Sequence, residues 1–329
     1  MVFEPAAKVR LGTSGVEVTR LGLGTAPLGN LYTAVTDDDA EATVQTALEL
    51  GLGLVDTAPL YGHGLAEQRI GRALIGRDRN TFALATKVGR LLRDATSTEH
   101  VQSYVGTPDV SPVFDFSYDG VMRSFEESLD RLGLDRVDIL HIHDPDDHHD
   151  EALEDAYRAL DQLRSEGSIG AVGAGMNQAA MLARFAREGD FDCFLLAGRY
   201  TLLDQTGLPE LLPLCLERNI AIIAGGVYNS GLLADPRRGA PFDYQPAPAH
   251  LVDRTLRLHE VCARHGVPLK AAAIQFPLGH PAVACVVIGA RTPLELVENI
   301  AMFRHPIPRD LWHELRAERL LAEDVPTPT

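Results

Sequence analysis

The chain of 329 residues contains only three lysines, Lys8, Lys87 and Lys270, beside 27 arginines. It is short of positive charge as a whole, because 46 acidic residues oppose 30 basic ones and leave a formal net charge of -16. Binding to a phosphate backbone needs clustered lysine and arginine side chains, so this balance argues against a nucleic-acid partner. The composition predicts a protein that acts on a small molecule.

Long hydrophobic runs and paired cysteines are also absent. Residues 1–10 hold no apolar stretch of signal-peptide length, and the longest apolar run, around Val283 to Ala290, is too short to span a bilayer. No two of the four cysteines form a CxxC pair, and each falls in an apolar run, so neither a zinc site nor a disulfide framework is indicated. We expect an unprocessed cytoplasmic protein with no membrane partner, whose oligomeric state the sequence leaves open.

What the chain does contain is an eightfold alternation of short apolar runs with longer amphipathic stretches. The runs predict parallel strands and the stretches predict crossover helices. The eight predicted strands are Arg20–Gly24, Leu52–Thr57, Thr81–Val88, Val137–His143, Ile169–Gly175, Cys193–Arg199, Ile220–Val227 and Val283–Gly289. Eight such units predict an α/β protein with a (β/α)8 TIM barrel, and no shift in composition divides residues 1–329 into more than one domain.

Three segments lie outside this repeat. Val9–Leu11 and Val16–Val18 flank a Gly-Thr-Ser-Gly turn, which predicts an N-terminal β-hairpin that plugs the barrel floor. Residues 89–117 form a long connection after the third strand, which is either a functional loop or a disordered surface insertion. The proline-rich segment Pro236–Pro248 follows the seventh strand and predicts a lid rather than a linker.

Polar residues end three consecutive predicted strands. Asp56 closes the second strand, Lys87 the third and His143 the fourth, and Tyr61 follows Asp56 in a turn-rich segment. Because active sites of TIM barrels lie at the carboxyl ends of the strands, we expect these four side chains to meet at one rim. Taken singly, each has a structural interpretation as a cap, an ion-pair partner or loop packing. Four matching residue types at one rim favour a catalytic site.

The chemistry of these four residues is coherent. Hydride transfer to a carbonyl needs a proton donor at the forming alkoxide, and the reverse reaction needs the matching base. Tyr61 can serve as both, because the Lys87 ammonium stabilises the phenolate and lowers a pKa that is ordinarily about 10. Asp56 would hold that ammonium protonated and in place, while neutral His143 would donate a hydrogen bond that orients the substrate oxygen.

Two other chemistries fit parts of the same region. A cluster with metal-ligand residue types contains His141, His143, Asp144, Asp146, Asp147, His148, His149 and Asp150. Residues 144–151 also fit an acidic helix N-terminus, which explains the carboxylates without a metal. Lys87 at a barrel strand end fits a Schiff-base aldolase as well. There is no GxGxxG motif and no Gly-Lys dipeptide, so neither a Rossmann nor a Walker-A site is predicted.

The same segments resemble motifs of the aldo-keto reductase superfamily. The resemblance spans the barrel and rests on Leu21-Gly-Leu-Gly-Thr25, Asp56-Thr-Ala-Pro-Leu-Tyr61-Gly, Ala85-Thr-Lys87 and His141-Ile-His143. It implies an oxidoreductase that uses NAD or NADP, with Asp56, Tyr61, Lys87 and His143 as the catalytic tetrad. A cofactor-binding regulatory subunit is the non-enzymatic alternative, since some members of the superfamily resemble channel auxiliary proteins.

The resemblance also implies a set of cofactor-binding residues. They are Gly24, Thr25, Asn177, Gly225, Gly226, Val227, Tyr228, Asn229, Gly231, Ile288, Gly289, Arg291, Glu295, Glu298 and Asn299. Asn177 would hold the nicotinamide amide, the loop from Gly225 the pyrophosphate, and the segment from Ile288 the adenosine end. Many relatives have an aromatic residue that stacks on the nicotinamide where Gly225 stands, and Tyr228 is the candidate substitute. Ala197 occupies the place of a Gln that often accompanies the family's Asn.

The cofactor preference follows from the same comparison and from charge. NADP-preferring relatives commonly present a Lys after the eighth strand and an Arg six residues later, where this chain has Gly289 and Glu295. A carboxylate repels a 2′-phosphate but can accept a hydrogen bond from the free ribose hydroxyl of NAD, so NAD is expected to be preferred. Arg291 lies in the same loop and would favour dual specificity.

Within the superfamily, two segments narrow the resemblance. Gly226-Val-Tyr-Asn-Ser-Gly231 and Ala197-Gly-Arg-Tyr-Thr-Leu-Leu203 are similar to the branch that contains L-fucose (D-threo-aldose) 1-dehydrogenases and pyridoxal 4-dehydrogenase. That branch implies oxidation of a cyclic hemiacetal, such as an aldose or pyridoxal, to a lactone. A general NADPH-dependent aldehyde or ketone reductase is the alternative.

Overall fold

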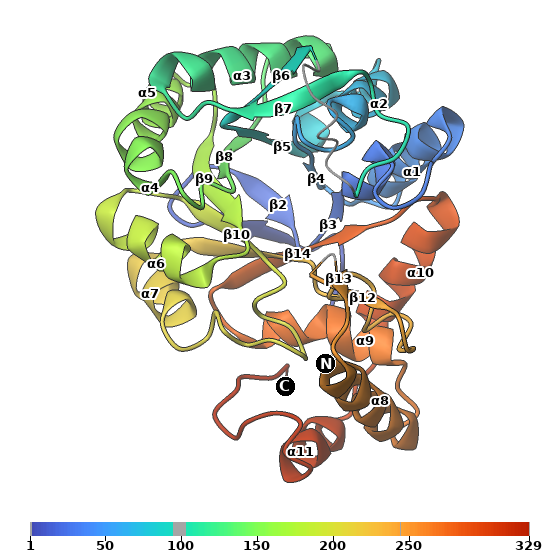
Figure 1. Ribbon diagram of the computed structural model, residues 1–329. Coiled ribbons are helices and arrows are strands. Elements are labelled where there is room, and N and C mark those ends of the chain that lie inside the picture. Colours follow the sequence, from blue (N-terminus) through green and yellow to red (C-terminus); the bar gives the residue numbers. More distant parts are fainter. Residues whose placement is uncertain (1, 95–102, 244, 329) are drawn as a thin grey trace.

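Eight parallel strands form a closed barrel in the computed structural model, which describes residues 2–94, 103–243 and 245–328 (Figure 1). The barrel strands are β3 (Leu21–Gly24), β4 (Leu54–Asp56), β5 (Ala83–Val88), β8 (Ile139–His143), β9 (Ala171–Met176), β10 (Cys193–Ala197), β11 (Ala221–Gly225) and β14 (Val283–Gly289). They neighbour one another in chain order, and β14 closes the barrel against β3. Each predicted strand corresponds to one of these, so the predicted (β/α)8 fold is confirmed.

Helices cover the outside of the barrel, as crossover connections between parallel strands require. They are α1 (Asp37–Glu49), α2 (Leu65–Leu74), α3 (Tyr118–Leu132), α4 (His149–Glu151), α5 (Tyr157–Ser165), α6 (Ala179–Glu188), α7 (Leu211–Arg218), α8 (Ala249–Arg264), α9 (Leu269–Gln275), α10 (Pro293–Arg304) and α11 (Arg309–Ala317). Thr36, Ser117 and Thr292 cap α1, α3 and α10, because each side chain accepts a hydrogen bond from a backbone N–H of the first turn.

Side chains of the barrel strands alternate between two cores, as the period of two requires. Leu84 and Ile142 point outward and join the large core beneath the helices. Ala85 belongs to a smaller core inside the barrel. Lys87 lies two residues beyond Ala85, and His143 lies on the inward face of β8 by the same alternation. The strand period therefore directs these polar side chains into the barrel rather than toward the helices.

The N-terminal hairpin closes the amino end of the barrel. β1 (Lys8–Arg10) pairs antiparallel with β2 (Glu17–Thr19), as the sequence predicts. Leu11 and Val18 are buried, and both belong to the inner core that the inward side chains of the barrel strands form. The predicted floor plug is therefore present, and the side chains that it inserts are apolar.

The long connection after β5 contains a second hairpin. β6 (Arg90–Asp94) pairs antiparallel with β7 (Val110–Phe114), while residues 95–102 lie outside the described part of the chain. The backbone N–H of Asp115 donates to the carbonyl oxygen of Gly89 at 3.0 Å, which ties the two ends of the connection together. The described part of this connection is thus an ordered hairpin at the rim.

The predicted lid contains the short hairpin formed by β12 (Pro241–Phe242) and β13 (Gln245–Pro246), and residue 244 lies outside the described residues. Asp243 accepts hydrogen bonds from the Arg199 guanidinium at 3.1 and 2.8 Å. This bidentate ion pair connects the segment to the loop after β10. That the segment opens and closes as a lid stays a prediction.

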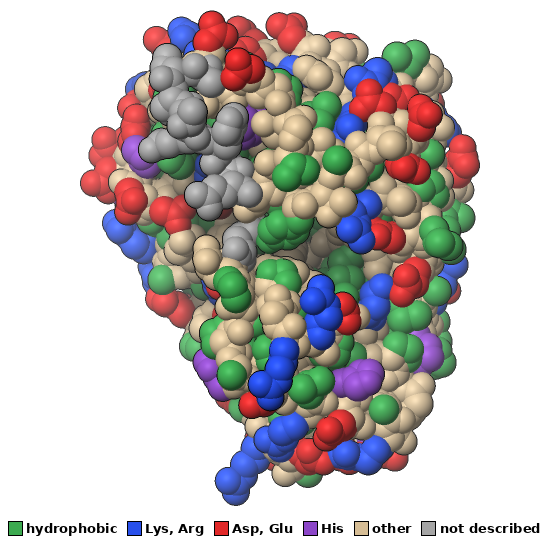
Figure 2. Space-filling view, turned by 45° about the vertical axis from the view of Figure 1, so that its right-hand side comes forward, with side chains coloured by type: hydrophobic (Ala, Val, Ile, Leu, Met, Phe, Trp, Pro, Cys, Tyr) green, Lys and Arg blue, Asp and Glu red, His purple; other side chains and the backbone are tan. Residues whose placement is uncertain are grey.

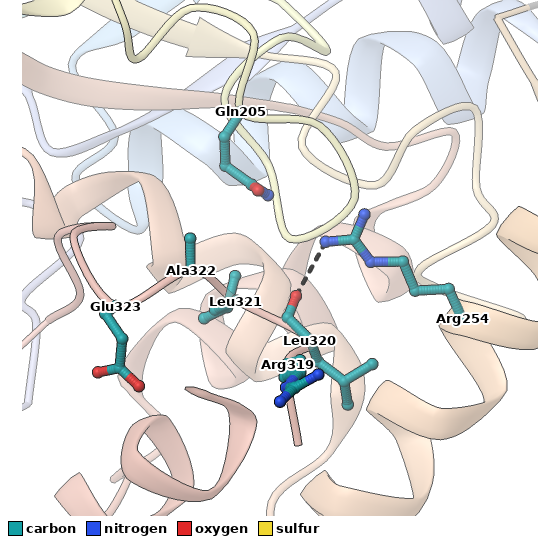
Figure 3. Close-up of a pocket in the computed structure, with 7 residues that line it drawn as sticks. All are labelled: Gln205, Arg254, Arg319, Leu320, Leu321, Ala322 and Glu323. Atoms are coloured by element: carbon teal, nitrogen blue, oxygen red, sulfur yellow. Dashed lines mark hydrogen bonds between the residues drawn. The ribbon is translucent and has the colours of Figure 1, made fainter. Parts of the chain in front are cut away.

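A pocket of about 620 Å³ lies at the periphery, between the loop after β10, α8 and the segment after α11 (Figure 3). It is lined by Gln205, Arg254, Arg319, Leu320, Leu321, Ala322 and Glu323. The Arg254 guanidinium donates to the carbonyl oxygens of Leu320 at 2.9 Å and Leu203 at 3.3 Å. None of the predicted site residues lines this pocket. The hydrogen bonds of Arg254 attach the C-terminal segment to α8 and to the loop after β10.

The surface carries both signs of charge. On the face drawn in Figure 2, basic side chains are spread among acidic ones rather than gathered in one patch. None of the helices in the described part of the chain combines the length and the apolar character that crossing a bilayer demands.

Candidate active site

A buried ion pair forms the base of the site. Lys87 donates hydrogen bonds to both carboxylate oxygens of Asp56, at 2.9 and 2.8 Å, and to the carbonyl oxygen of Thr57 at 2.8 Å. The two side chains are buried, and burial raises the pKa of Asp56 while the Lys87 charge opposes that rise. The predicted pairing is present. Because an ammonium has three N–H donors, all of them are used, and the position of the charge is fixed.

A turn of unusual backbone conformation holds Tyr61 above this pair. Gly62, His63 and Gly64 all have positive φ, at 63°, 53° and 89°, a region that glycine adopts freely and histidine rarely does. The backbone of Gly62 also lies against that of Gly29, so closely that a Cβ atom on either glycine would clash. Tertiary contacts therefore fix the direction of the chain just after Tyr61.

The Tyr61 ring lies near both the cation and an imidazole. Its centroid is 4.6 Å from the Lys87 nitrogen and 6.0 Å from the centroid of the His143 ring, which it meets edge to face. Burial holds the pKa of His143 well below its usual value, and the charges of Arg90 and Lys87 act in the same direction. The four residues predicted to form the tetrad share one site, and the histidine in it is neutral.

A second histidine lies deeper in the barrel. His141 is fully buried, and burial lowers its pKa to about 3. Neither of its ring nitrogens has a hydrogen-bond partner within the described part of the chain. On the adjacent strand, Gly173 makes room for the ring, since a Cβ atom there would lie 2.3 Å from His141 Nδ1. His141 is therefore a neutral core residue beneath the site.

The potential metal ligands of residues 141–150 do not converge. His148 contacts Glu151 at 3.2 Å, whereas His149 contacts Asp150 at 2.9 Å and stacks on Phe185. Across the described residues, no group of three or more His, Cys, Asp or Glu is arranged to hold a metal ion. Asp150 and Glu151 lie instead in the first turn of α4, where the helix dipole favours negative charge.

Residues behind the rim hold the strands that carry the tetrad. Glu67 is fully buried, accepts a hydrogen bond from Thr86 at 2.6 Å and pairs with Arg131 at 2.7 Å. Thr25, predicted to bind the cofactor, donates both its hydroxyl and its backbone N–H to the carbonyl oxygen of Asp56, at 2.9 and 3.0 Å. These long-range partners were not predicted from the sequence; they attach the end of β4 to the residue after β3, and β5 to α2.

The segments predicted to bind the cofactor lie on neighbouring strands. β11, β14 and β3 are consecutive in the barrel, so Gly225, Gly289 and Gly24 end adjacent strands. The next part of the rim is formed by β4, β5 and β8, which carry Asp56, Lys87 and His143, while Tyr61 follows β4. Asn177 lies beyond them, just after β9. The predicted cofactor residues therefore flank the tetrad on both sides.

The loop after β11 has a backbone suited to an anion. Gly226, Asn229, Ser230 and Gly231 have positive φ values of 62°, 47°, 56° and 98°. Loops that mix right-handed and left-handed residues direct backbone N–H groups into concavities that bind anions. Asn229 Oδ1 is buried and has no partner among the residues that the structure describes, and Ser230 hydrogen-bonds with Tyr32 in the segment after β3. These residues fit the diphosphate of a dinucleotide.

At the end of β14, two cations are each paired with a carboxylate. Arg291 donates from its side chain to Glu295 at 2.6 and 3.0 Å and from its backbone N–H at 2.9 Å. Lys270 pairs with Glu298 at 2.7 Å. Glu295 also lies in the first turn of α10, so it stabilises the start of that helix while it neutralises Arg291.

Tyr228 is fixed toward α10. Its hydroxyl donates to Asn299 Oδ1 at 3.2 Å, the Lys270 nitrogen lies 5.8 Å from its ring, and Asn299 in turn donates to the carbonyl oxygen of Gly289 at 3.3 Å. Gly225 leaves the inward face of β11 without a side chain, and a Cβ atom there would lie 3.2 Å from Leu195. The contacts thus link Tyr228 to the β14 side of the rim, and its role in stacking stays a prediction.

Two charged residues beside His143 were not assigned to the site by sequence. Arg90 donates to Asp144 Oδ2 at 2.9 Å, and that oxygen lies 3.4 Å from His143 Nε2. The sequence indicated Asp144 as a potential metal ligand or as part of an acidic helix N-terminus, and Arg90 was not identified from it. Arg90 follows the third predicted strand by two residues, so its place at the same rim was the available signal.

The comparisons with known proteins agree with this geometry. The chain is 42% identical to pyridoxal 4-dehydrogenase from Microbacterium luteolum, over 98% of this chain and 100% of that protein. It is also 42% identical to D-threo-aldose 1-dehydrogenase from a Pseudomonas species, over 99% of each. Both alignments run the length of the barrel.

Solved structures show the same architecture. An aldo-keto reductase from Bacillus halodurans, 26% identical, superimposes with a TM-score of 0.76 over 97% of each chain. A glycerol dehydrogenase from Gluconobacter oxydans, 22% identical, gives 0.74 over 99% of this chain and 98% of the other, which supports the fold. The profile of the aldo/keto reductase family matches residues 20–318. The chain is therefore an oxidoreductase that belongs to the aldo/keto reductase family.

Proposed function

We propose that this enzyme oxidises the cyclic hemiacetal of an aldose, or of pyridoxal, to a lactone, with Asp56, Tyr61, Lys87 and His143 as the catalytic residues. The observation that carries the proposal is the 42% identity, over nearly the full length, to two dehydrogenases named for D-threo-aldose and for pyridoxal. These compounds differ in size and in aromatic character, but both form cyclic hemiacetals. A shared reaction at the hemiacetal carbon would explain why this chain is equally similar to two dehydrogenases named for such different compounds.

The residues of the site supply what this oxidation requires. NAD or NADP, when bound, supplies the hydride acceptor. The Lys87 nitrogen lies 4.6 Å from the centroid of the Tyr61 ring and is fixed by Asp56, so its positive charge favours the phenolate form of Tyr61, which is the form that can accept a proton. Neutral His143 donates a hydrogen bond to the substrate hydroxyl oxygen. The anomeric carbon loses its hydrogen with both bonding electrons, the hydroxyl proton passes to Tyr61, and the C–O bond becomes the lactone carbonyl.

Product analysis tests this proposal. The enzyme is incubated with NAD and L-fucose or pyridoxal, and the product is identified by mass spectrometry while nicotinamide absorbance is followed. The expected product is two hydrogens lighter than the substrate and is a lactone. Turnover of open-chain aldehydes or ketones alone, in the reductive direction with NADPH, would identify a general reductase instead. Cofactor binding without turnover of any of these compounds would favour a regulatory subunit.

For the cofactor, we propose a preference for NAD. Arg291 and Lys270 are the cations near the end of β14, and each is already paired with a carboxylate, so a 2′-phosphate would have to compete with Glu295 and Glu298. Ile288, Gly289 and Asn299 would line the adenosine end of this site. A ribose hydroxyl needs no added positive charge and can donate to a carboxylate such as Glu295.

Reversing the charge at Glu295 tests this preference. In Glu295→Arg, kcat/KM for NADP relative to NAD should rise by about tenfold, which corresponds to about 1.4 kcal/mol. Glu260→Arg introduces the same charge change at an exposed position on α8 and should leave the ratio unchanged. A wild-type preference for NADP, or the same NADP-to-NAD ratio of kcat/KM in both variants, would show that Glu295 does not set the cofactor preference.

A further inference from the structure

Asp144 directly follows His143 and has a left-handed backbone conformation. Its φ is 43°, in the left-handed region that residues other than glycine, asparagine and aspartate seldom adopt. Its backbone N–H donates to the carbonyl oxygen of Gly175 on the neighbouring strand at 3.0 Å. This conformation turns the chain away from β8 at the residue after the catalytic histidine. It places the Asp144 carboxylate beside the imidazole.

The two carboxylate oxygens of Asp144 have different surroundings. Oδ2 accepts a hydrogen bond from Arg90 at 2.9 Å and lies 3.4 Å from His143 Nε2. Oδ1 has no hydrogen-bond partner among the described residues, and the side chain is 27% exposed. A carboxylate oxygen without a donor among the described residues, on a side chain that is partly exposed and directly follows His143, is an acceptor available to a substrate.

Arg90 is held in place by the β6–β7 hairpin. Arg90 on β6 pairs with Phe114 on β7, and its guanidinium carbon lies 4.5 Å from the centroid of the Phe114 ring. Its Nε atom is buried and has no hydrogen-bond partner in the described ranges of the chain. Burial raises the pKa of Asp144, while the Arg90 charge beside it opposes that rise. Arg90 therefore orients the carboxylate and favours its ionised form.

We propose that Asp144, oriented by Arg90, selects substrates that carry a free hydroxyl on the carbon next to the reacting carbon. For an aldose this is the C2 hydroxyl. The inference rests on the proposed function and on the placement of His143. If His143 donates to the anomeric oxygen, the two nearest oxygens of the sugar are the C2 hydroxyl and the ring oxygen. The hydroxyl can donate to a carboxylate, whereas the ring oxygen carries no hydrogen and would be repelled by it. Asp144 would therefore fix which side of the sugar faces β8.

A matched pair of sugars tests this inference. We would measure kcat/KM for L-fucose and 2-deoxy-L-fucose, with the same cofactor, in the wild type and in Asp144→Gly and Asp144→Asn. Glycine removes the carboxylate and asparagine keeps the shape without the charge, and both residues tolerate positive φ. Asp147→Asn, at an exposed position in the same loop, is the control.

The wild type should prefer the 2-hydroxy sugar by roughly 10- to 100-fold, as expected for a hydrogen bond to a charged group. Asp144→Gly should reduce that preference to within about threefold while it still oxidises the deoxy sugar, and Asp144→Asn should fall between the two. Asp147→Asn should keep the wild-type ratio. Cofactor titration and melting temperature would establish that each variant is folded.

The alternative outcomes are distinguishable. Equal activity of the wild type on both sugars overturns the role of Asp144 and leaves the proposed function standing. An equal loss of both sugars in Asp144→Gly also overturns it, because Asp144 would then act through His143. Oxidation of pyridoxal without either sugar overturns the inference alone. Oxidation of none of the three contradicts the proposed function itself.

Discussion

The two ends of the barrel use the same inward-facing positions for opposite purposes. At the amino end, Leu11 and Val18 of the hairpin join apolar strand residues in the inner core. At the carboxyl end, those positions hold a buried ion pair, Lys87 and Asp56, and the neutral imidazole of His143. A buried ion pair contributes little net stability because desolvation offsets its attraction, whereas apolar burial is favourable. Stability and chemistry are thus separated along the barrel axis.

The largest expected effect of a substitution is at the carboxyl end. Tyr61→Phe should lower kcat by about 10²- to 10⁴-fold, because it removes the proton acceptor and leaves the ring in place. Cofactor affinity, measured by fluorescence titration, should change by less than about threefold, since little contact area is lost. Tyr118→Phe removes a hydroxyl that contacts Gln162 on the outer surface and should keep wild-type kcat. Wild-type turnover by Tyr61→Phe would exclude the proposed relay.

Lys87→Met should separate activity from stability. It leaves the Asp56 carboxylate buried without its counter-ion, which costs about 3–5 kcal/mol of unfolding free energy. Without Lys87, the folded-state pKa of Asp56 should lie further above its unfolded value of about 3.9, so the variant should lose stability as pH rises above about 4. Urea unfolding at pH 5 and pH 8 measures this difference.

The double variant Lys87→Met with Asp56→Asn provides the control for that experiment. Removing both charges should recover part of the lost stability and abolish the dependence on pH that Lys87→Met adds, because residue 56 no longer titrates and no uncompensated ion remains. It should not recover turnover. If Lys87→Met were as stable as the wild type at pH 8, Lys87 would not be compensating a buried Asp56 charge, and the proposed difference between the two ends of the barrel would be wrong.

A smaller effect is expected at the floor. Leu11→Ala should lower the unfolding free energy by about 3 kcal/mol, within the range for a buried leucine. Below the melting temperature, kcat and KM should stay within about twofold of the wild type, because the hairpin is at the opposite end from the tetrad. Ile75→Ala, at an apolar side chain that is 80% exposed, should change neither quantity. A large loss of activity in Leu11→Ala would show that the two ends are coupled.

The sequence predicted the barrel because its strands are buried on both faces and therefore appear as apolar runs. The sequence also predicted the tetrad, because a residue at the carboxyl end of a barrel strand has a known position along the barrel axis and a side chain that points inward or outward by alternation. It could not predict the positive φ of His63, which depends on close backbone contact between Gly29 and Gly62. The contact of Arg90 with Asp144 also depends on how the insertion hairpin folds, 54 residues away in the chain.

The scarcity of lysine has a practical consequence for handling the enzyme. Of the three side-chain amines, Lys87 is enclosed by its partners, and Lys270 is only 24% exposed and pairs closely with Glu298, at 2.7 Å. Lys8 is 73% exposed and lies on β1, in the hairpin at the amino end of the barrel. Amine-directed coupling of side chains to a solid support should therefore attach the protein through Lys8. That attachment would leave the opposite end of the barrel, with Tyr61 and His143, facing the solution.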